Sequence, residues 1–411
     1  MTGPLPRHAP MTQFPVIDDS LVVGGVPLTA LAEKVGRTPF YAYDRRVIDE
    51  RIAVLRRHLP PSVKLHYAMK ANPMPELVGH IARLVDGLDV ASAGELRVAL
   101  DAKTGPREIS FAGPGKTEDE LRQAVASGIL LNVESEREIR VLARLMHETG
   151  TRPRVAVRVN PDFELKSSGM RMGGGPKQFG VDADQVPGLL GEIGRLGLGF
   201  EGFHIFWGSQ NLKAEAICEA QRKSFDLAVE LARSAPAKVR VLNIGGGFGI
   251  PYFPGELPLD PQPIGRNLAA LASRAASELP DASLVVELGR YLVGEAGIYV
   301  CRVIDRKISR GHVFLVTDGG LHHHLAASGN FGQVIRKNYP VVIGNRVNGE
   351  RREIASVVGP LCTPLDLLAD RMELAEAREG DLVVVFQSGA YGFTASPLSF
   401  LSHPHPTEIV V

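Results

Sequence analysis

The sequence is poor in cysteine, has no long apolar run and carries no excess of charge of one sign. Its three cysteines, Cys218, Cys301 and Cys362, lie far apart among 411 residues. An odd number of widely spaced cysteines argues against a disulfide framework or a zinc cluster and favours a reducing compartment. Lysine plus arginine equals aspartate plus glutamate, at 46 each, so the composition indicates neither nucleic acid nor an anionic membrane as a partner.

The chain also lacks the apolar segments that direct a protein into or across a membrane. No run is long enough to span a bilayer, and the first thirteen residues contain no apolar signal-peptide core. We therefore expect a cytoplasmic protein in which residues 1–13 form a loose tail and order begins near Phe14. The sequence has no internal repeat or low-complexity stretch, and its length predicts two or more domains.

Short apolar runs alternate with helix-like segments through the first two thirds of the chain. The runs are Val63–Tyr67, Gly87–Val90, Ile109–Phe111, Ile129–Val133, Val155–Val159, Phe200–Ile205, Val239–Ile244 and Leu284–Glu287. Eight strand–helix units over about 230 residues match the size of a (β/α)8, TIM-like barrel, with a doubly wound open sheet as the alternative. We assign the barrel to residues 44–290. The loops after runs one, two, five, six, seven and eight carry polar or glycine-rich residues, which would converge on one face of a barrel.

The pattern changes after Gly289. The later runs are β-type and mostly lack helices between them: Ile298–Ile304, Val313–Thr317, Val341–Ile343, Ile354–Val358 and Leu382–Phe386. They predict a mainly antiparallel β-barrel or sandwich domain over residues 291–411. Residues 14–43 contain strand signals of their own, and we expect them to join this domain.

One lysine stands out because of its position. Lys70 lies in the string His66–Asn72, directly after the first apolar run and before Pro73. Burial is costly for a lysine and lowers the pKa of an ammonium group, and a neutral amine can form a Schiff base with an aldehyde. The alternative is a strand-end lysine whose side chain simply reaches solvent.

A glycine-rich string and a glutamate suggest what such a lysine would bind. In Asn243–Gly249, consecutive glycines after a strand let backbone N–H groups approach a phosphate, although a tight turn explains them as well. In Glu287–Tyr291, Arg290 could add a bidentate charge, and Glu287 could pair with a heterocyclic nitrogen or with an arginine. With Lys70, these features describe a pyridoxal phosphate site.

Seven strings, in the same order, match one family. They are His66–Asn72, Asp89–Glu95, Arg158–Pro161, Asn243–Gly249, Glu287–Tyr291, Gly359–Cys362 and Gly389–Gly392. From about Phe14 onward the chain resembles the alanine-racemase-fold, or type III, pyridoxal-phosphate decarboxylases, which include ornithine, arginine and diaminopimelate decarboxylases.

The resemblance implies a role for each matching position. Lys70 would hold the cofactor aldehyde, His204 would stack on the pyridine ring, and Glu287 would pair with the ring nitrogen. A histidine inside an apolar run is otherwise more often a core group. Asp89 and Arg158 would line the ring and order the lysine. The residues expected to hold the phosphate are Gly246, Gly247, Arg290 and Tyr391, with Ser209 as a weaker candidate, and Gly289 is expected to contribute to cofactor binding.

The resemblance also implies a head-to-tail homodimer with shared active sites. Cys362, supplied by the partner subunit, would protonate the substrate α-carbon after carbon dioxide leaves. The alternative for Cys362 is a small buried hydrophobe.

The residue after Cys362 departs from the family pattern. Basic-amino-acid decarboxylases of this family usually have an acidic residue there, which receives the distal ammonium of the substrate, whereas this chain has Thr363. An unpaired buried ammonium is costly, so Thr363 argues against free ornithine or lysine unless Asp366 compensates.

Further strings resemble one subgroup of the family. They are residues 170–180, 318–324, 336–340 and 397–404, and they resemble decarboxylases found with exosortase and exopolysaccharide systems and relatives that act on a glutamyl group carried on an acyl carrier protein. Arg336 and Tyr339 then become candidates for substrate binding. Arg171 and Lys177 could contact a carboxylate or phosphopantetheine, or could simply belong to a solvated basic loop.

Three adjacent histidines raise the question of a metal. If His322–His324 formed part of a strand, their side chains would alternate between its faces, so at most two could share one ion. No other ligand spacing supports a metal site, and we expect none.

The leading interpretation is a decarboxylase that removes the α-carboxylate of a free diamino acid, such as diaminopimelate, or of a carrier-linked amino acid, such as a glutamyl group. One alternative is a racemase on the same fold, which would need a second base opposite Lys70. Another is a non-catalytic regulatory homologue that binds pyridoxal phosphate.

Overall fold

The computed structural model describes residues 7–163, 170–171 and 174–411, which divide into two compact units. The barrel unit comprises Arg51–Gly249 and Leu259–Gly289, and the β unit comprises Met1–Glu50, Ile250–Pro258 and Arg290–Val411. Among the described residues, no helix is both long and apolar enough to cross a membrane.

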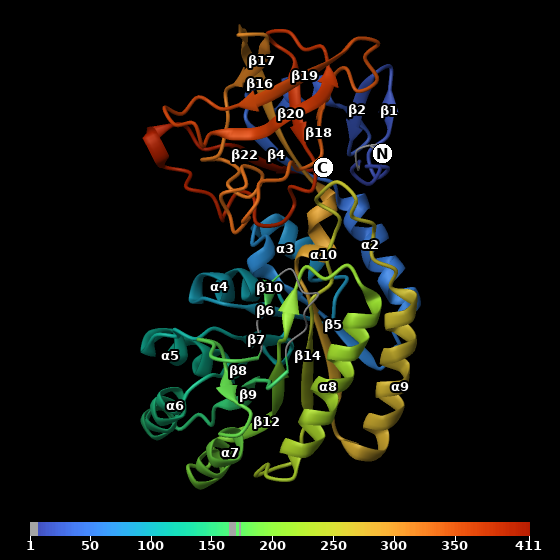
Figure 1. Ribbon diagram of the computed structural model, residues 1–411. Helices are drawn as coiled ribbons and strands as arrows, with labels where there is room; N and C mark the ends of the chain where they lie inside the picture. The colour runs from blue at the N-terminus through green and yellow to red at the C-terminus, as the bar shows by residue number, and fades with distance from the viewer. Residues whose placement is uncertain (1–6, 164–169, 172–173) are drawn as a thin grey trace. The chain divides into compact units, whose positions relative to one another are not determined.

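The barrel unit contains a closed ring of parallel strands (Figure 1). In order around the ring, the strands are β9 (Arg154–Asn160), β12 (Gly199–Ile205), β14 (Val241–Gly246), β15 (Ser283–Leu288), β5 (Val63–Ala68), β6 (Gly87–Val90), β7 (Ile109–Phe111) and β8 (Leu130–Val133). β8 pairs with β9, with Leu130 opposite Arg154, and this pairing closes the ring. The predicted (β/α)8 barrel is therefore confirmed, and the open sheet is wrong. Strands buried on both faces explain the nearly continuous apolar runs.

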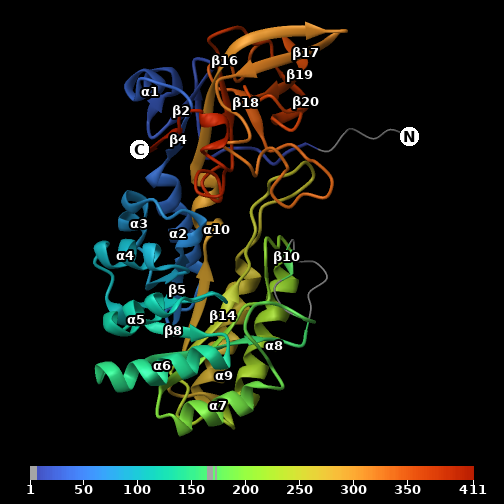
Figure 2. The ribbon, with the colours of Figure 1, turned by 90° about the vertical axis from the view of Figure 1, so that its left-hand side faces the viewer.

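Helices surround these strands, as Figures 1 and 2 show. They are α2 (Arg45–His58, which crosses the boundary between the units), α3 (Pro75–Ile81), α4 (Ala93–Asp101), α5 (Glu118–Ser127), α6 (Glu136–Thr149), α7 (Val186–Arg195), α8 (Ala214–Ala232) and α9 (Gln262–Glu278). Local sequence defines their ends. The Thr117 and Glu120 side chains form a capping box at the start of α5, and Gly128, with φ 70°, ends this helix. Ser135 caps α6 by accepting from the backbone N–H of Glu138.

Several short elements complete the barrel unit. They are the 3₁₀ turns η1 (Met69–Ala71) and η2 (Pro106–Glu108), and the two-residue strands β10 (Met170–Arg171), β11 (Val181–Asp182) and β13 (Gly208–Ser209). β11 pairs with β9 outside the closed ring, and β10 pairs antiparallel with β13. Residues 170–171, which follow β9 in the sequence, therefore lie beside residues 208–209, which follow β12.

The β unit is built around the long strand β16 (Gly297–Ser309), which pairs antiparallel with three other strands. The strands of its main sheet are β4 (Phe40–Tyr43), β16, β17 (His312–Thr317), β18 (Val341–Ile343), β19 (Arg352–Val358), β20 (Leu367–Ala375), β21 (Leu382–Val385) and β22 (Thr407–Val410). Most pairings are antiparallel, but β17 with β19 and β22 with β4 are parallel. The prediction of a mainly antiparallel β domain is therefore confirmed, with two parallel pairings that make the sheet mixed.

Smaller elements of the β unit come from both ends of the chain. They are β1 (Val16–Ile17), β2 (Ser20–Val23), β3 (Val26–Pro27), α1 (Leu28–Val35), α10 (Arg290–Val293), η3 (Gly294–Ala296) and η4 (Phe400–Ser402). The N-terminal strand β4 pairs with β16 and β22, which both follow the barrel in sequence.

Residues 44–50 were assigned to the barrel but belong to the β unit. Two further segments differ from the predicted organisation. Residues 250–258 were assigned to the barrel but belong to the β unit, where the Gln387 amide donates to the Pro251 carbonyl at 2.8 Å. Residues 7–13 are not a loose tail. Ala9 is buried, and the Arg7 carbonyl accepts from the Gly255 N–H at 2.9 Å. Both segments are held by residues distant in sequence, which local pattern does not reveal.

Candidate active site

A cavity of about 340 Å³ opens at the carboxyl ends of the barrel strands. It is lined by five of the predicted site residues, Lys70, Asp89, Arg158, His204 and Glu287. Parts of two loops also line it, namely Ala112–Pro114 after β7 and Phe179 before β11. Its size and mixed apolar and polar lining suit a small-molecule ligand.

Lys70 lies where the sequence predicted, but it is not buried. β5 ends at Ala68, and the turn η1 carries Lys70 into the barrel opening, where its side chain is exposed. The Lys70 Nζ lies 5.3 Å from the centre of the Phe206 ring. The expectation of a buried lysine is wrong because the chain leaves the strand after Ala68, two residues before Lys70, and the amine therefore reaches the cavity.

Glu287 on β15 and His204 on β12 form a buried pair across the strand β14 that lies between them. The His204 Nε2 lies 2.9 Å from the Glu287 Oε2, although no hydrogen bond to either ring nitrogen is found within the described chain. The Asn243 amide donates to the same carboxylate oxygen at 2.9 Å. Burial by itself raises the pKa of Glu287, but the charges of His204, Lys70 and Arg158 lower it by more, so the pKa lies well below its ordinary value. Glu287 is therefore a carboxylate at neutral pH.

Asp89 has one carboxylate oxygen paired and one free to bind a ligand. Its Oδ1 accepts from the Ser110 hydroxyl at 2.6 Å and lies 3.0 Å from the His66 Nδ1. The Asn132 amide donates to the Ser110 hydroxyl at 3.1 Å, so the buried hydrogen bonds run from Asn132 through Ser110 to Asp89. The Asp89 Oδ2 is buried and has no hydrogen-bond partner among the residues that the structure describes.

The glycine string forms a tight cradle beside Glu287, since Gly246 pairs with Glu287 in the sheet register. A Cβ on Gly246 would overlap the Glu287 carbonyl oxygen. Gly247 has a φ of 72°, and a Cβ there would lie 2.6 Å from the ring of Trp207. Trp207 is buried and donates to the Ile244 carbonyl at 3.2 Å. Only glycine therefore fits the close packing of this string against β15 and Trp207.

Ser209 and Gly289 flank the cradle. The backbone N–H of Asn211 donates to the Gly247 carbonyl at 2.9 Å, which joins the Ser209 segment to the glycine string. The Ser209 hydroxyl is buried and lacks a hydrogen-bond partner in the described part of the protein. A Cβ on Gly289 would lie 2.9 Å from the Ala68 carbonyl oxygen, so β15 leaves the barrel close to the end of β5.

The remaining predicted residues belong to the β unit. Arg290 donates to the Tyr252 hydroxyl at 2.8 Å, and its guanidinium carbon lies 4.7 Å from the Tyr391 ring. Tyr339 is buried against the Tyr252 ring at 4.7 Å, and burial raises the pKa of its phenol. The Arg336 guanidinium donates to the Ser328 carbonyl.

The loop that follows β19 carries the other three candidates. Cys362 is exposed, so the alternative of a buried hydrophobe is wrong. The Thr363 hydroxyl accepts from the Leu365 N–H at 3.3 Å. Asp366 accepts from the backbone N–H groups of Leu321 and Leu361, one on each carboxylate oxygen, at 2.6 and 2.8 Å. Asp366 is buried and ties its own loop to the segment at Leu321, and we do not assign it to the substrate.

Two further expectations concern loops. His322–His324 lie buried in a turn rather than in a strand, so the argument from alternating faces does not apply. No group of three or more histidine, cysteine, aspartate or glutamate side chains that could hold a metal occurs among the described residues. The side chain of Arg171 lies outside the described part of the chain.

Comparison with known proteins identifies the family. Its sequence profile, described as "Pyridoxal-dependent decarboxylase, pyridoxal binding domain", matches residues 45–294. The chain belongs to the pyridoxal-dependent decarboxylase family. This finding confirms the resemblance seen in the seven sequence strings, and with it the cofactor, pyridoxal phosphate.

Relatives and solved structures cover nearly the whole chain. The chain is 38% identical to the L-glutamyl-[BtrI acyl-carrier protein] decarboxylase of Niallia circulans over 93% of this chain and 90% of that one. It is 34% identical to a diaminopimelate decarboxylase of Aquifex aeolicus, covering 96% and 91%. Among solved structures, AQ1208 of Aquifex aeolicus matches with a TM-score of 0.84 at 32% identity, covering 97% and 92%. A diaminopimelate decarboxylase of Helicobacter pylori with bound L-lysine matches with a TM-score of 0.81 at 26% identity, covering 93% and 94%.

The residues present fit pyridoxal phosphate. The described barrel unit offers buried polar atoms without hydrogen-bond partners at Asp89 Oδ2, His204 Nδ1 and Ser209 Oγ, a glycine cradle for an anion, and an accessible amine at Lys70. Sequence reasoning missed the contribution of the loops after β7 and β8. Gly113 follows the third apolar run and Glu134 follows the fourth, and an acidic residue directly after a barrel strand is the signal that could have found Glu134.

Proposed function

We propose that this protein decarboxylates an amino acid without a distal ammonium group, and that a glutamyl group carried on an acyl carrier protein is the substrate that fits best. The observation that carries this proposal is the loop after β19, where Thr363 provides no charge and both oxygens of Asp366 already accept backbone N–H groups. A distal ammonium would find no accessible carboxylate in this loop, because Asp366 is only 3% exposed. The name of the 38% identical relative agrees with such a substrate.

Free diaminopimelate is the second candidate, because relatives at 34% and 32% identity carry that name. A diaminopimelate decarboxylase must bind an amino acid with a second ammonium. The side chains of the 362–366 loop argue against diaminopimelate as the substrate, whereas the sequence similarity to the named diaminopimelate decarboxylases argues for it.

The chain's own residues have separable tasks in the proposed reaction. When bound, pyridoxal phosphate supplies an aldehyde for the substrate amine and a ring that accepts electrons as carbon dioxide leaves. Glu287, whose low pKa keeps it ionised, holds the proton on the ring nitrogen. The backbone N–H groups of Gly246 and Gly247 and the hydroxyl of Ser209 bind the phosphate. Lys70 attaches the cofactor and moves a proton at the substrate α-carbon.

A second group is needed to return the proton, and we propose the thiol of Cys362 for it. This thiol is exposed, and in a head-to-tail homodimer it would complete the active site of the partner subunit. The homodimer and a cytoplasmic location are part of the proposal. Three cysteines that form no disulfide support a reducing compartment.

A carbon-dioxide release assay tests the substrate. The panel is glutamate, carrier-bound glutamate, diaminopimelate, lysine, ornithine and arginine. We expect release from the carrier-bound glutamyl group and little from the dibasic amino acids. Activity confined to free dibasic substrates would overturn the proposal, and a product that keeps its carboxylate but loses its chirality would identify a racemase.

A substitution at Thr363 sharpens the test. Thr363→Glu restores an acidic residue after Cys362, and we expect it to increase kcat/KM for diaminopimelate by about tenfold, the effect of one added charge-assisted hydrogen bond. Thr363→Gln is the matched control without charge and should give no such gain. Equal behaviour of the two variants would show that Thr363 does not select the substrate.

A further inference from the structure

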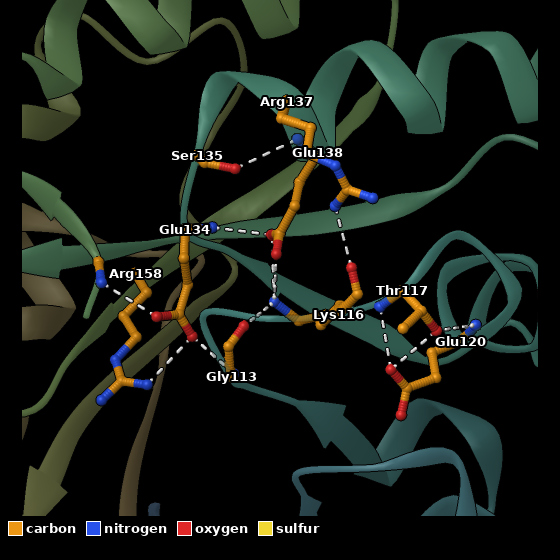
Figure 3. Close-up of polar contacts among 10 residues, drawn as sticks. Gly113, Lys116, Thr117, Glu120, Glu134, Ser135, Arg137, Glu138 and Arg158 are labelled. Carbon is orange, nitrogen blue, oxygen red and sulfur yellow. Dashed lines mark hydrogen bonds and ion pairs between the residues drawn. The ribbon is translucent and has the colours of Figure 1, made fainter. Parts of the chain in front are cut away.

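Glu134 lies outside the cavity, yet it joins three of the segments that line it. It follows β8 directly and is 7% exposed. Its Oε1 accepts from the Gly113 backbone N–H at 2.6 Å and from the Arg158 Nη1 at 3.0 Å. Its Oε2 accepts from the Gly180 backbone N–H at 3.0 Å. Figure 3 shows the Glu134 carboxylate facing Arg158 and the Gly113 segment.

The groups that Glu134 holds are parts of the cofactor site. Arg158 and Gly113 line the cavity, and so does Phe179, the neighbour of Gly180. The Arg158 guanidinium also lies 5.0 Å from the Phe179 ring centre, so a carboxylate and a ring together define its position. Gly180 has a φ of 71°, and a Cβ there would lie 2.9 Å from the Arg158 carbonyl oxygen. This close approach brings the Gly180 N–H to Glu134.

A buried ion pair behind Glu134 keeps it in place. The Glu138 carboxylate accepts from the Glu134 backbone N–H at 2.9 Å and from Lys116 Nζ at 3.0 and 3.1 Å. Lys116 also donates to the Gly113 carbonyl at 2.7 Å, and both charged side chains are 1% exposed. Burying an ion pair is costly unless its hydrogen bonds are satisfied. Here the pair, shown in Figure 3, ties the loop at Gly113 to the start of α6.

Charge also matters at this position. Burial by itself raises the pKa of Glu134, but the charges of Arg158 and Lys116 and the N–H groups of Gly180 and Gly113 lower the pKa below its ordinary value. Glu134 is thus an anion that offsets the charge of Arg158. The positive charge of Arg158 in turn helps to lower the pKa of Glu287, so the orientation of Arg158 affects the carboxylate at the cofactor ring.

We propose that Glu134 is a positioning residue of the active site, which sets the orientation of Arg158 and of the loop segments at Gly113 and Gly180 toward the cofactor. The inference rests on the proposed function, because it assigns the cavity to pyridoxal phosphate. Glu134 itself contacts neither substrate nor cofactor.

Glu134→Gln tests this role with minimal change of shape. The amide keeps one acceptor oxygen but directs an NH₂ group at a donor and removes the charge that faces Arg158. We expect the dissociation constant of pyridoxal phosphate, titrated into cofactor-free protein by absorbance, to rise about tenfold or more, as for a lost charge-assisted hydrogen bond. We also expect the acidic limb of the kcat/KM pH profile to shift. Glu136→Gln is the matched control, because Glu136 is exposed at the start of α6, two residues from Glu134, and pairs only with Arg140 in the described chain.

A double-mutant cycle separates positioning from simple stabilisation of the fold. If Glu134 acts through Arg158, Glu134→Gln should cost much less cofactor affinity in an Arg158→Gln background than in the wild type. If the losses of cofactor affinity caused by the two substitutions were fully additive, Glu134 would not act through Arg158 and the inference would be overturned. A Glu134→Gln protein with wild-type cofactor affinity and pH profile but a lower melting temperature would overturn it as well. Should Glu134→Gln not fold, Arg158→Lys, which keeps the charge, is expected to show the same loss of affinity, and wild-type affinity in that variant would overturn the inference.

The two proposals fail in different ways. Wild-type protein that does not bind pyridoxal phosphate would sink the proposed function. Wild-type protein that binds the cofactor and releases carbon dioxide, together with a Glu134→Gln variant indistinguishable from it, would overturn only the role of Glu134.

Discussion

The buried histidines of the β unit make the fold sensitive to mild acid. His322, His323 and His324 are at most 1% exposed. Burial, the largest cause in each case, lowers the pKa of His322 to about 3, of His323 to about 4 and of His324 to about 3. Neighbouring histidine charges lower the first two further. Unfolded histidines bind a proton near pH 6.5, so below that pH the unfolded state binds more protons than the folded state.

The sign and size of the effect follow from this difference. Stability is unaffected by these groups above about pH 6.5 and falls as the pH falls toward the folded pKa values, by about 1.4 kcal/mol per pH unit for each histidine. Between pH 7 and pH 5 each histidine should cost about 2 kcal/mol, and the three together about 6 kcal/mol, which is a large share of the stability of an ordinary domain.

One substitution isolates a single histidine. Neither ring nitrogen of His322 has a hydrogen-bond partner among the residues that the structure describes, so His322→Leu removes a titrating group without breaking such a bond. We expect equal or greater stability at pH 7, since no buried polar group remains unpaired, and about 2 kcal/mol less loss between pH 7 and pH 5. Chemical denaturation followed by circular dichroism at both pH values measures this. His147→Gln, at an exposed position of α6, is the control.

The reasoning would be refuted by a wild-type stability that does not change between pH 7 and pH 5. It would equally be refuted by a His322→Leu protein with the wild-type loss, because the titration of His322 would then not be the cause.

Two further predictions concern the cofactor site. Lys70→Ala should still fold, since the Lys70 side chain is exposed, but it should lose the visible absorbance of lysine-bound cofactor and nearly all decarboxylase activity; retained absorbance would show that another amine holds the cofactor. Gly247→Ala should destabilise the barrel by about 1–3 kcal/mol and weaken cofactor binding, because its φ of 72° and the Trp207 ring at 2.6 Å leave no room for a methyl group. Thermal denaturation measures the loss of stability, and cofactor titration measures the loss of affinity. Adding Trp207→Phe to Gly247→Ala should recover part of the lost stability. A Gly247→Ala protein with wild-type stability and cofactor affinity would contradict the proposed cradle.

The sequence by itself determined the barrel and most of the residues around its cavity. Parallel strands buried on both faces must be continuous apolar runs, and residues that follow such runs must meet at one end of a barrel. For this reason Lys70 and Glu287 could be predicted as neighbours, and the family resemblance added Asp89, Arg158 and His204. Each of the five lies within two residues of the end of a strand.

Local pattern failed where long-range contacts decide the structure. Residues 250–258 follow a barrel strand, but they belong to the β unit through contacts with residues more than a hundred positions away, such as Gln387. Lys70 was expected to be buried because its strand is buried, but a single 3₁₀ turn is enough to expose it. Neither outcome changes the hydrophobic periodicity from which the elements were predicted.

Only the tertiary structure decided what the two most informative carboxylates do. The sequence made Asp366 a candidate for binding the substrate, but in the structure it is buried and accepts hydrogen bonds from backbone N–H groups 5 and 45 residues away. The sequence did not indicate a role for Glu134, because its partners Gly113, Arg158 and Gly180 lie 21, 24 and 46 residues away in the chain. A carboxylate can accept several hydrogen bonds at once, and which donors it meets depends on how the barrel closes rather than on the residues beside it in the chain.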